Sequence, residues 1–163
     1  MLLKVDLKTK HATRVRGSKL KDFGLDERSF QDILFRSLDR LIPDDELLIL
    51  MQSRRGPEEP DLMALDKDGK LYIFELKAWE ARSENLLQVL RYGQLFGAHE
   101  YDNLEKLYQL HHKSEKALNH IHEARFEITL EKKQFNSGQI FVVITNGIDF
   151  KTRDLRSKLC VFH

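Results

Sequence analysis

Three charged residues, Asp61, Glu75 and Lys77, stand beside two short apolar stretches of the chain. Two carboxylates held close together repel each other, and a cation between them relieves that repulsion. Carboxylate oxygens are also the ligands that Mg²⁺ and Mn²⁺ prefer, with water and phosphate oxygens completing the coordination. A metal held in this way can activate a water, and a lysine can orient that water or stabilise charge on a phosphoryl group. Hydrolysis of a phosphodiester would use all of these features together.

The apolar stretches Leu62–Leu65 and Leu71–Leu76 predict the two strands of a β-hairpin, because turn residues separate them. A three-residue loop, with Gly69 in the left-handed conformation, pairs Asp66 with Lys70. Counting back from that pair sets the two carboxylates opposite each other, with the lysine on the same face. A two-residue loop would shift the register by one and separate the carboxylates onto opposite faces. The three-residue loop therefore predicts that Asp61, Glu75 and Lys77 converge on one face of the hairpin as a candidate active site.

The dipeptide Pro60-Asp61, followed at the end of the next strand by Glu75-Leu76-Lys77, resembles the PD-(D/E)xK motif of the restriction-endonuclease-like nuclease superfamily. The resemblance implies that Asp61 and Glu75 hold Mg²⁺ or Mn²⁺, with the backbone carbonyl of Leu76 as a further ligand. It also implies that Lys77 positions the attacking water. The other interpretation of the same residues is a hairpin whose terminal charges form a solvated ion pair.

The stretch from Glu27 to Ile42 predicts a helix, because its apolar residues recur at helical spacing and Pro43 follows it. Asp26 is placed to cap its first turn. In the resembled superfamily a glutamate on the first helix joins the acidic cluster, and Glu27 is the residue that matches. The alternative for Glu27 is an acidic residue that is favourable near a helix N-terminus.

A second helix is expected from about Ser83 to Ala98, with Leu86, Leu87, Leu90 and Phe96 on its buried side. Gln88 and Tyr92 are four residues apart and so share one face of this helix. Together they resemble the extra Q-x-x-x-Y motif of the RecB-like and NucS-like branches of the superfamily. That resemblance implies contacts with nucleic acid, and packing on the helix surface is the alternative.

Two arginines, Arg54 and Arg55, precede Asp61 in a loop and are candidates for contacts with nucleic-acid phosphates. A basic arm lies at the N-terminus, where seven lysines and arginines in residues 1–21 outnumber the single Asp6. Such an arm can follow phosphates, although a solvated strand surface explains it equally well.

The remaining apolar patterns predict further elements of the fold. Ile140–Ile144 is expected to be a central strand buried on both faces, and Ile128–Glu131 a short strand. Tyr101–Phe126 is expected to form one polar helix that could serve as an oligomer surface; its histidines are expected to be solvated, so zinc is not predicted. Met1–Arg16 is expected to supply one or two edge strands.

The order of these elements resembles the αβββαβ core of the superfamily, an α/β fold with a mixed central sheet flanked by helices. We expect a single nuclease-like domain over residues 1–163. Its parts would be an arm over 1–24, a core over 25–146 and a C-terminal extension over 147–163, shorter than in the resembled proteins. That departure is consistent with a fragment, or with a sheet edge completed by a partner chain such as a second copy.

Composition excludes several classes of protein. No run of apolar residues is long enough for a membrane span, and the single cysteine, Cys160, cannot form an internal disulfide. A cytoplasmic setting is expected from these features. The chain carries 27 basic and 26 acidic residues, so its overall charge does not by itself indicate a nucleic-acid partner.

The sequence favours a Mg²⁺- or Mn²⁺-dependent deoxyribonuclease, a hydrolase. A non-cleaving nucleic-acid-binding module and an assembly subunit with the same fold are the alternatives. DNA is the expected partner and no membrane is. RNA as a substrate, the strand state of the substrate, endo- or exonucleolytic action and homodimer formation stay open.

Overall fold

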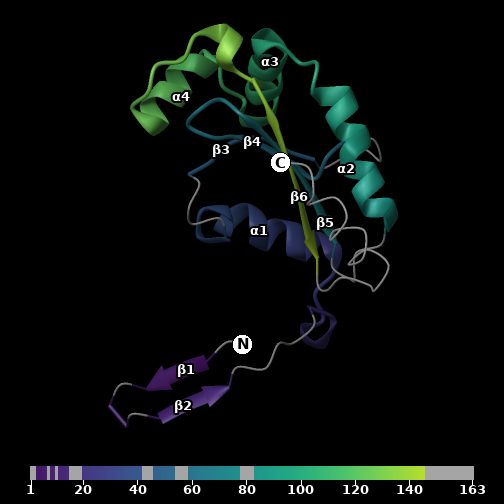
Figure 1. Ribbon diagram of the computed structural model, residues 1–163, viewed down its shortest axis with the longest axis vertical. Helices are drawn as coiled ribbons and strands as arrows, with labels where there is room; N and C mark the ends of the chain where they lie inside the picture. Colours follow the sequence, from purple (N-terminus) through teal and green to yellow (C-terminus); the bar gives the residue numbers. More distant parts are fainter. Residues whose placement is uncertain are drawn as a thin grey trace, which may run out of the picture.

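A computed structural model describes residues 3–6, 8–9, 11–14, 20–41, 46–53, 59–77 and 83–145. Their strands form two sheets, a two-stranded one of β1 and β2 and a four-stranded one in the order β3-β4-β5-β6 (Figure 1). The strands are β1 (Leu3–Asp6), β2 (His11–Arg14), β3 (Leu48–Gln52), β4 (Leu62–Leu65), β5 (Leu71–Lys77) and β6 (Gln139–Thr145). The helices are α1 (Glu27–Leu41), α2 (Ser83–Phe96), α3 (Tyr101–His112) and α4 (Leu118–Phe126), with short 3₁₀ turns at Leu20–Phe23 and Lys132–Gln134. The expected α/β class, with a mixed sheet flanked by helices, is confirmed.

The β4–β5 hairpin has the predicted three-residue loop. Gly69 has a φ of +80°, and the amide of Asp66 donates to the carbonyl of Lys70 at 3.1 Å. The Asp66 carboxylate also holds the turn, since its Oδ1 accepts the amides of Asp68 and Lys70. The paired residues run from Leu65 opposite Leu71 to Leu62 opposite Phe74. The predicted register is therefore confirmed.

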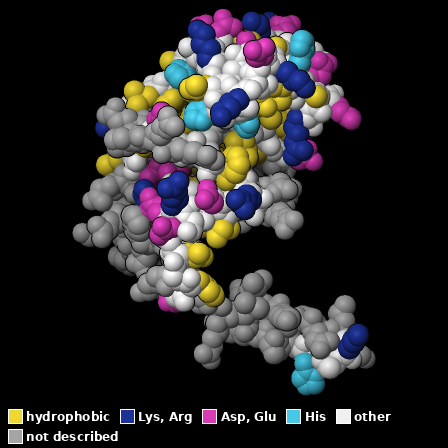
Figure 2. Space-filling view, turned by 180° about the vertical axis from the view of Figure 1, so that it is seen from behind, with side chains coloured by type: hydrophobic (Ala, Val, Ile, Leu, Met, Phe, Trp, Pro, Cys, Tyr) yellow, Lys and Arg dark blue, Asp and Glu magenta, His cyan; other side chains and the backbone are white. Residues whose placement is uncertain are grey.

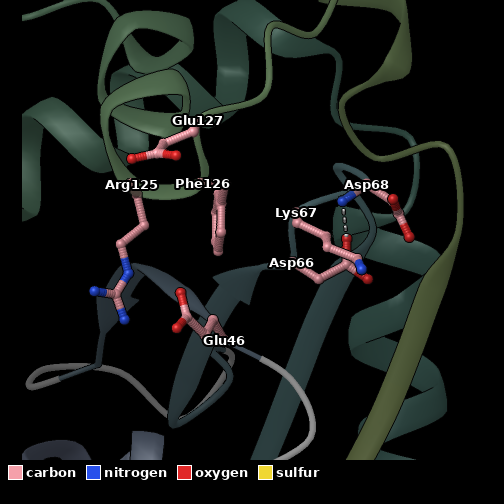
Figure 3. Close-up of a pocket in the computed structure, with 7 residues that line it drawn as sticks. All are labelled: Glu46, Asp66, Lys67, Asp68, Arg125, Phe126 and Glu127. Carbon is pink, nitrogen blue, oxygen red and sulfur yellow. Dashed lines mark hydrogen bonds between the residues drawn. The ribbon is translucent and has the colours of Figure 1, made fainter.

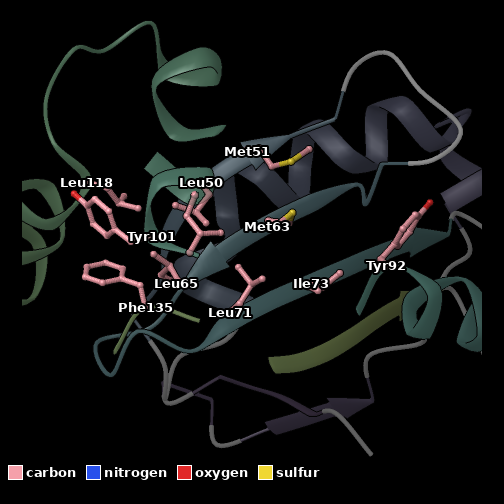
Figure 4. Packing of buried hydrophobic residues seen from close by; sticks show 11 residues of the cluster. Leu50, Met51, Met63, Leu65, Leu71, Ile73, Tyr92, Tyr101, Leu118 and Phe135 are labelled. Carbon is pink, nitrogen blue, oxygen red and sulfur yellow. The ribbon is translucent and has the colours of Figure 1, made fainter. Parts of the chain in front are cut away.

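Both faces of the central sheet are covered by apolar packing, because successive residues of β4 and β5 point to opposite sides. One cluster joins the sheet to α2, α3 and α4 (Figure 4). It contains Leu50, Met51, Met63, Leu65, Leu71, Ile73, Tyr92, Tyr101, Leu104, Leu118 and Phe135. The other cluster joins the sheet to α1 and contains Leu34, Leu47, Leu62, Ala64, Tyr72, Phe74 and Leu76. Residues 71–76 of β5 are thus fully buried.

Helix α1 begins as expected, because the amide of Ser29 donates to Asp26 Oδ1 at 2.8 Å. It is kinked at Ser37, whose φ and ψ are not helical. The buried side of α2 was predicted only in part: Phe96 packs against the apolar cluster, but Leu87 is 65% exposed and Leu90 is 49% exposed, while Val89 and Tyr92 are buried. Helix α2 approaches β6 closely at Gly93, which turns this side of the helix toward the sheet. A Cβ at Gly93 would lie 2.5 Å from the ring of Phe141.

The expected single helix over Tyr101–Phe126 is two helices. Lys113 ends α3 in the left-handed conformation, with a φ of 50°, and α4 starts afterwards at Leu118. Leu104 and Leu118 are both buried. They are spaced so that one continuous helix would also place them on one face, which is why the pattern suggested one.

Three strand predictions need correction. Ile128–Glu131 is not a strand; this segment leads into the 3₁₀ turn beside Gly69, and no described strand pairs with it. Ile140–Ile144 is a strand, parallel to β5, but it is half-buried at the edge of the described sheet rather than central. β1 and β2 pair only with each other, so they are not edge strands of the central sheet. They form a hairpin that projects from the body (Figure 1).

No helix within the described residues is both long and apolar enough to cross a membrane. On the face seen in Figure 2, basic and acidic side chains are interspersed over the described surface. This distribution agrees with the balanced net charge of +1.

The two glycines near the hairpin turn give a matched test of the register. Replacing Gly69 with alanine should lower the free energy of unfolding by at least about 1–2 kcal/mol, because an L side chain is strained at this left-handed φ. Its Cβ would also lie 2.7 Å from the carbonyl oxygen of Gln134. Gly138→Ala is the control, since its Cβ would meet only Lys70 Cγ, at an ordinary 3.8 Å. Urea unfolding of both variants measures the difference, and equal stabilities would contradict the strained turn.

Candidate active site

The ends of β4 and β5 bring Asp61, Glu75 and Lys77 together. Leu62 pairs with Phe74, so the next residues along the two strands, Asp61 and Glu75, are opposite each other. Lys77 follows two residues later on the same face of β5. The convergence predicted from the hairpin is therefore present.

Asp61 is held by two hydrogen bonds from different elements. The backbone amide of Leu76, on β5, donates to Asp61 Oδ2 at 2.7 Å. The side-chain amide of Gln31, on α1, donates to Asp61 Oδ1 at 2.5 Å. Among the described residues each carboxylate oxygen therefore has one donor, and because an oxygen can accept more than one bond, each can still serve a ligand.

Glu75 and Lys77 form a close ion pair in a largely buried setting. Lys77 Nζ lies 2.8 Å from Glu75 Oε1, and the side chain of Glu75 is only 2% exposed. No other donor of the described residues reaches this oxygen. Glu27 approaches from α1, with its Oε1 3.5 Å from Lys77 Nζ and its buried Oε2 without a hydrogen-bond partner among the described residues. The lysine thus bridges two glutamates.

Burial dominates the ionisation of this group. Desolvation raises the pKa of Asp61, and the Leu76 amide and the Lys77 charge offset only part of the effect. Desolvation likewise raises the pKa of Glu75, against the opposing hydrogen bond from Lys77. For Lys77, desolvation lowers the pKa, but the hydrogen bond and charge of Glu75 and the charges of Glu27 and Asp61 outweigh it and leave the pKa raised. Burial therefore disfavours the charged form of both carboxylates, and Lys77 only partly compensates.

Helix α2 presents the Gln88–Tyr92 pair to the same region. Gln88 Nε2 donates to the hydroxyl of Tyr92 at 2.6 Å, and Tyr92 is 2% exposed. Desolvation raises the pKa of Tyr92, and the negative charges of Glu75 and Asp61 raise it further. The tyrosine is therefore both a core residue and electrostatically coupled to the two carboxylates.

The donor set suits a small divalent cation, although the carboxylates are not gathered as one cluster. Asp61, Glu75 and the carbonyl of Leu76 are oxygen donors of the kind that Mg²⁺ and Mn²⁺ take, and one or two carboxylates are enough for Mg²⁺. In the described part of the chain, no three His, Cys, Asp or Glu side chains surround a common point as metal ligands. Glu27 joins the site through Lys77, so an ion at Glu75 would compete with the ammonium group.

Of three further residues, two were predicted for the site and one was not. Arg54 and Arg55 lie outside the described residues. Gln31 was not predicted as a site residue, although its position one helical turn after Glu27 could have indicated it. Nothing in the sequence near Gln31 marks Asp61 as its partner, because the two lie 30 residues apart in the chain.

Two hollows of the described surface lie away from this site. One, of about 470 Å³, lies at the far end of the hairpin between the turn and the end of α4 (Figure 3). The ring of Phe126 projects into it between Arg125 and the turn residues Asp66 and Lys67 (Figure 3). The second, of about 610 Å³, lies between α3 and α4 beside Tyr108. Five residues of strand separate Asp61 from Asp66, about 17 Å, so the first hollow is not part of the carboxylate site.

The buried acids predict how the metal-free protein responds to pH. Because the pKa of Glu75 is raised above its ordinary 4.5 in the folded protein, the folded state binds protons more readily than the unfolded chain. The stability from this group is present at low pH and is lost as the pH rises above about 4.5. Glu75→Gln should therefore show a smaller fall in the free energy of unfolding between pH 4 and pH 8, measured by urea unfolding in EDTA. The exposed Glu59→Gln is the control, and identical pH profiles for wild type and Glu75→Gln would contradict this assignment.

Comparisons of this chain with models of known protein families, with curated proteins and with solved structures found no significant match.

Proposed function

We propose that this chain is a nuclease that hydrolyses DNA phosphodiester bonds with the help of Mg²⁺ or Mn²⁺. The observation that carries the proposal is the convergence of Asp61, Glu75 and Lys77 at the ends of paired strands, with Lys77 Nζ 2.8 Å from Glu75. Burying two carboxylates and an ammonium group together is costly for a fold. The group suits a site that binds a cation and a phosphate.

The order of the elements supports the same proposal. After the N-terminal hairpin come α1, three strands in an antiparallel meander, then α2 and a strand parallel to β5. This order resembles the αβββαβ order expected for a restriction-endonuclease-like core, with α3 and α4 added before β6. Asp61 lies directly before β4, and Glu75 and Lys77 lie at the end of β5.

Each residue has a role that its surroundings fit. Asp61 and Glu75, with the carbonyl of Leu76, would hold the metal ion. When bound, the ion would supply a water of lowered pKa and positive charge beside the scissile phosphate. Lys77 is a cation next to Glu75, placed to orient the attacking water and to stabilise negative charge on phosphorus. Glu27 holds the lysine from the other side, 3.5 Å away.

Binding of the nucleic acid would depend on local contacts more than on long-range attraction. The net charge is +1, and both signs are interspersed on the face in Figure 2. Gln88 is half-buried and already oriented by the hydroxyl of Tyr92. The rest of its amide group can therefore contact a phosphate or a base edge. The N-terminal hairpin adds a projecting basic segment that can reach phosphates outside the site (Figure 1).

Lys77→Met should reduce metal-dependent cleavage of DNA by at least about 100-fold, because it removes the charge beside the reacting phosphate while keeping side-chain length. Lys67→Met is the matched control, since Lys67 stands in the turn at the other end of the same hairpin. Cleavage of labelled single-stranded, duplex and branched DNA is measured with Mn²⁺ or EDTA. Full activity of Lys77→Met would remove the assignment. DNA binding without cleavage in the wild type would favour the non-cleaving binding module.

Tyr92→Phe should keep the fold, because the ring stays in the core, but should release the Gln88 amide. We expect the efficiency of cleavage, kcat/KM, to fall by about two- to tenfold, the usual effect of losing one neutral hydrogen bond. Steady-state cleavage of a short DNA substrate measures it. Tyr108→Phe, on α3 beside the second hollow, is the control; an unchanged kcat/KM for Tyr92→Phe would mean that the pair serves packing alone.

A further inference from the structure

Helix α1 contributes two polar side chains to the site at one-turn spacing. Glu27 reaches Lys77 Nζ at 3.5 Å, and Gln31 reaches Asp61 Oδ1 at 2.5 Å. The helix thereby contacts residues at the ends of both strands of the hairpin through one charged and one neutral side chain. Glu27 carries charge toward a cation, and Gln31 brings an uncharged donor toward an anion.

The Gln31 contact helps to fix the orientation of the Asp61 carboxylate. A carboxylate can only accept, so the amide of Gln31 must present its nitrogen. Together with the Leu76 amide on Oδ2, at 2.7 Å, this contact holds both oxygens of Asp61 and so sets the plane of the group. The Leu76 bond alone would leave the carboxylate free to swing about that single point.

The charges around Asp61 explain why such a restraint matters. Lys77 attracts the carboxylate and Glu27 repels it, and both act on Asp61 in its half-buried position. An unrestrained carboxylate would move toward the lysine, which already bridges Glu75 and Glu27. A neutral donor restrains Asp61 without neutralising it, whereas a lysine at position 31 would add a competing cation.

We propose that Gln31 is a positioning residue that holds the Asp61 carboxylate in the orientation in which it binds the metal ion. The inference rests on the proposed nuclease function, because it assigns Asp61 the role of metal ligand. Gln31 touches neither substrate nor metal in this role. It acts through Asp61, as outer hydrogen-bond donors do at other metal sites.

Gln31→Met tests this role, since methionine keeps the length and helix preference of glutamine but cannot donate. We expect the affinity for Mn²⁺, measured by calorimetric titration of the metal-free protein, to fall about 10- to 100-fold. In the metal-free protein, the amide proton of Leu76 should exchange with solvent about tenfold faster, because its acceptor is no longer held. Circular dichroism confirms that the variant is folded.

Ile33→Ala is the control, because its side chain lies on the same helix and is 45% exposed. It should leave Mn²⁺ affinity and Leu76 exchange unchanged. Wild-type affinity and Leu76 exchange in Gln31→Met would overturn the inference while leaving the proposed function intact. A wild-type protein that takes up no Mn²⁺ and cleaves no DNA would overturn both. Gln31→Ala repeats the measurement should the methionine variant not fold.

Discussion

The register of the β4–β5 hairpin is the constraint on which the site and the core both depend. Side chains alternate between the faces of the sheet, so a shift by one residue would exchange the two apolar clusters. It would also carry Asp61 away from Glu75. Gly69 sets the register through its left-handed backbone, and the rest of the fold is built against it: the amide of Asn136 donates to the Gly69 carbonyl at 2.7 Å. The turn, the apolar core and the candidate site therefore all depend on the same strand register.

Buried charge is the cost of this arrangement. Glu75 is almost fully enclosed, and its ionisation is disfavoured even with Lys77 at 2.8 Å. Well-packed apolar residues at such positions are often as stable as an ion pair, or more so. The hairpin would thus hold together without the trio, since β5 is buried along its whole apolar stretch. Lys77 offsets part of the repulsion between the two facing carboxylates, but both keep raised pKa values.

How far the sequence predicts this molecule depends on the distance over which each feature is decided. The hairpin, its loop, the Asp26 cap and the facing of Asp61 and Glu75 follow from neighbouring residues, so they could be predicted. The exposed side of α2 could not, because Leu87 and Leu90 look like core positions until Gly93 is seen against Phe141. The break at Lys113 was missed for a similar reason, since the apolar spacing continues through it.

In the candidate site, too, some residues follow from neighbouring sequence and others from packing between distant segments. Asp61, Glu75 and Lys77 come from a local pattern, and Glu27 from its place at a helix start. Gln31 depends on how α1 lies across the sheet, and that is decided by packing between distant segments. The short strand expected at Ile128–Glu131 failed because a strand needs a partner, and the segment lies instead beside the Gly69 turn.

The packing of α1 explains how a helix can place polar groups with such accuracy. Phe30 and Leu34 pack with the apolar cluster on one face of the sheet, and that cluster includes Leu76. On a helix, residues 27, 30, 31 and 34 form one continuous face. The apolar half of this face fixes the helix against β5, and the polar half then necessarily meets the ends of the strands. Burial of Phe30 and Leu34 therefore orients Glu27 and Gln31, so the free energy that stabilises the core also holds the site in place.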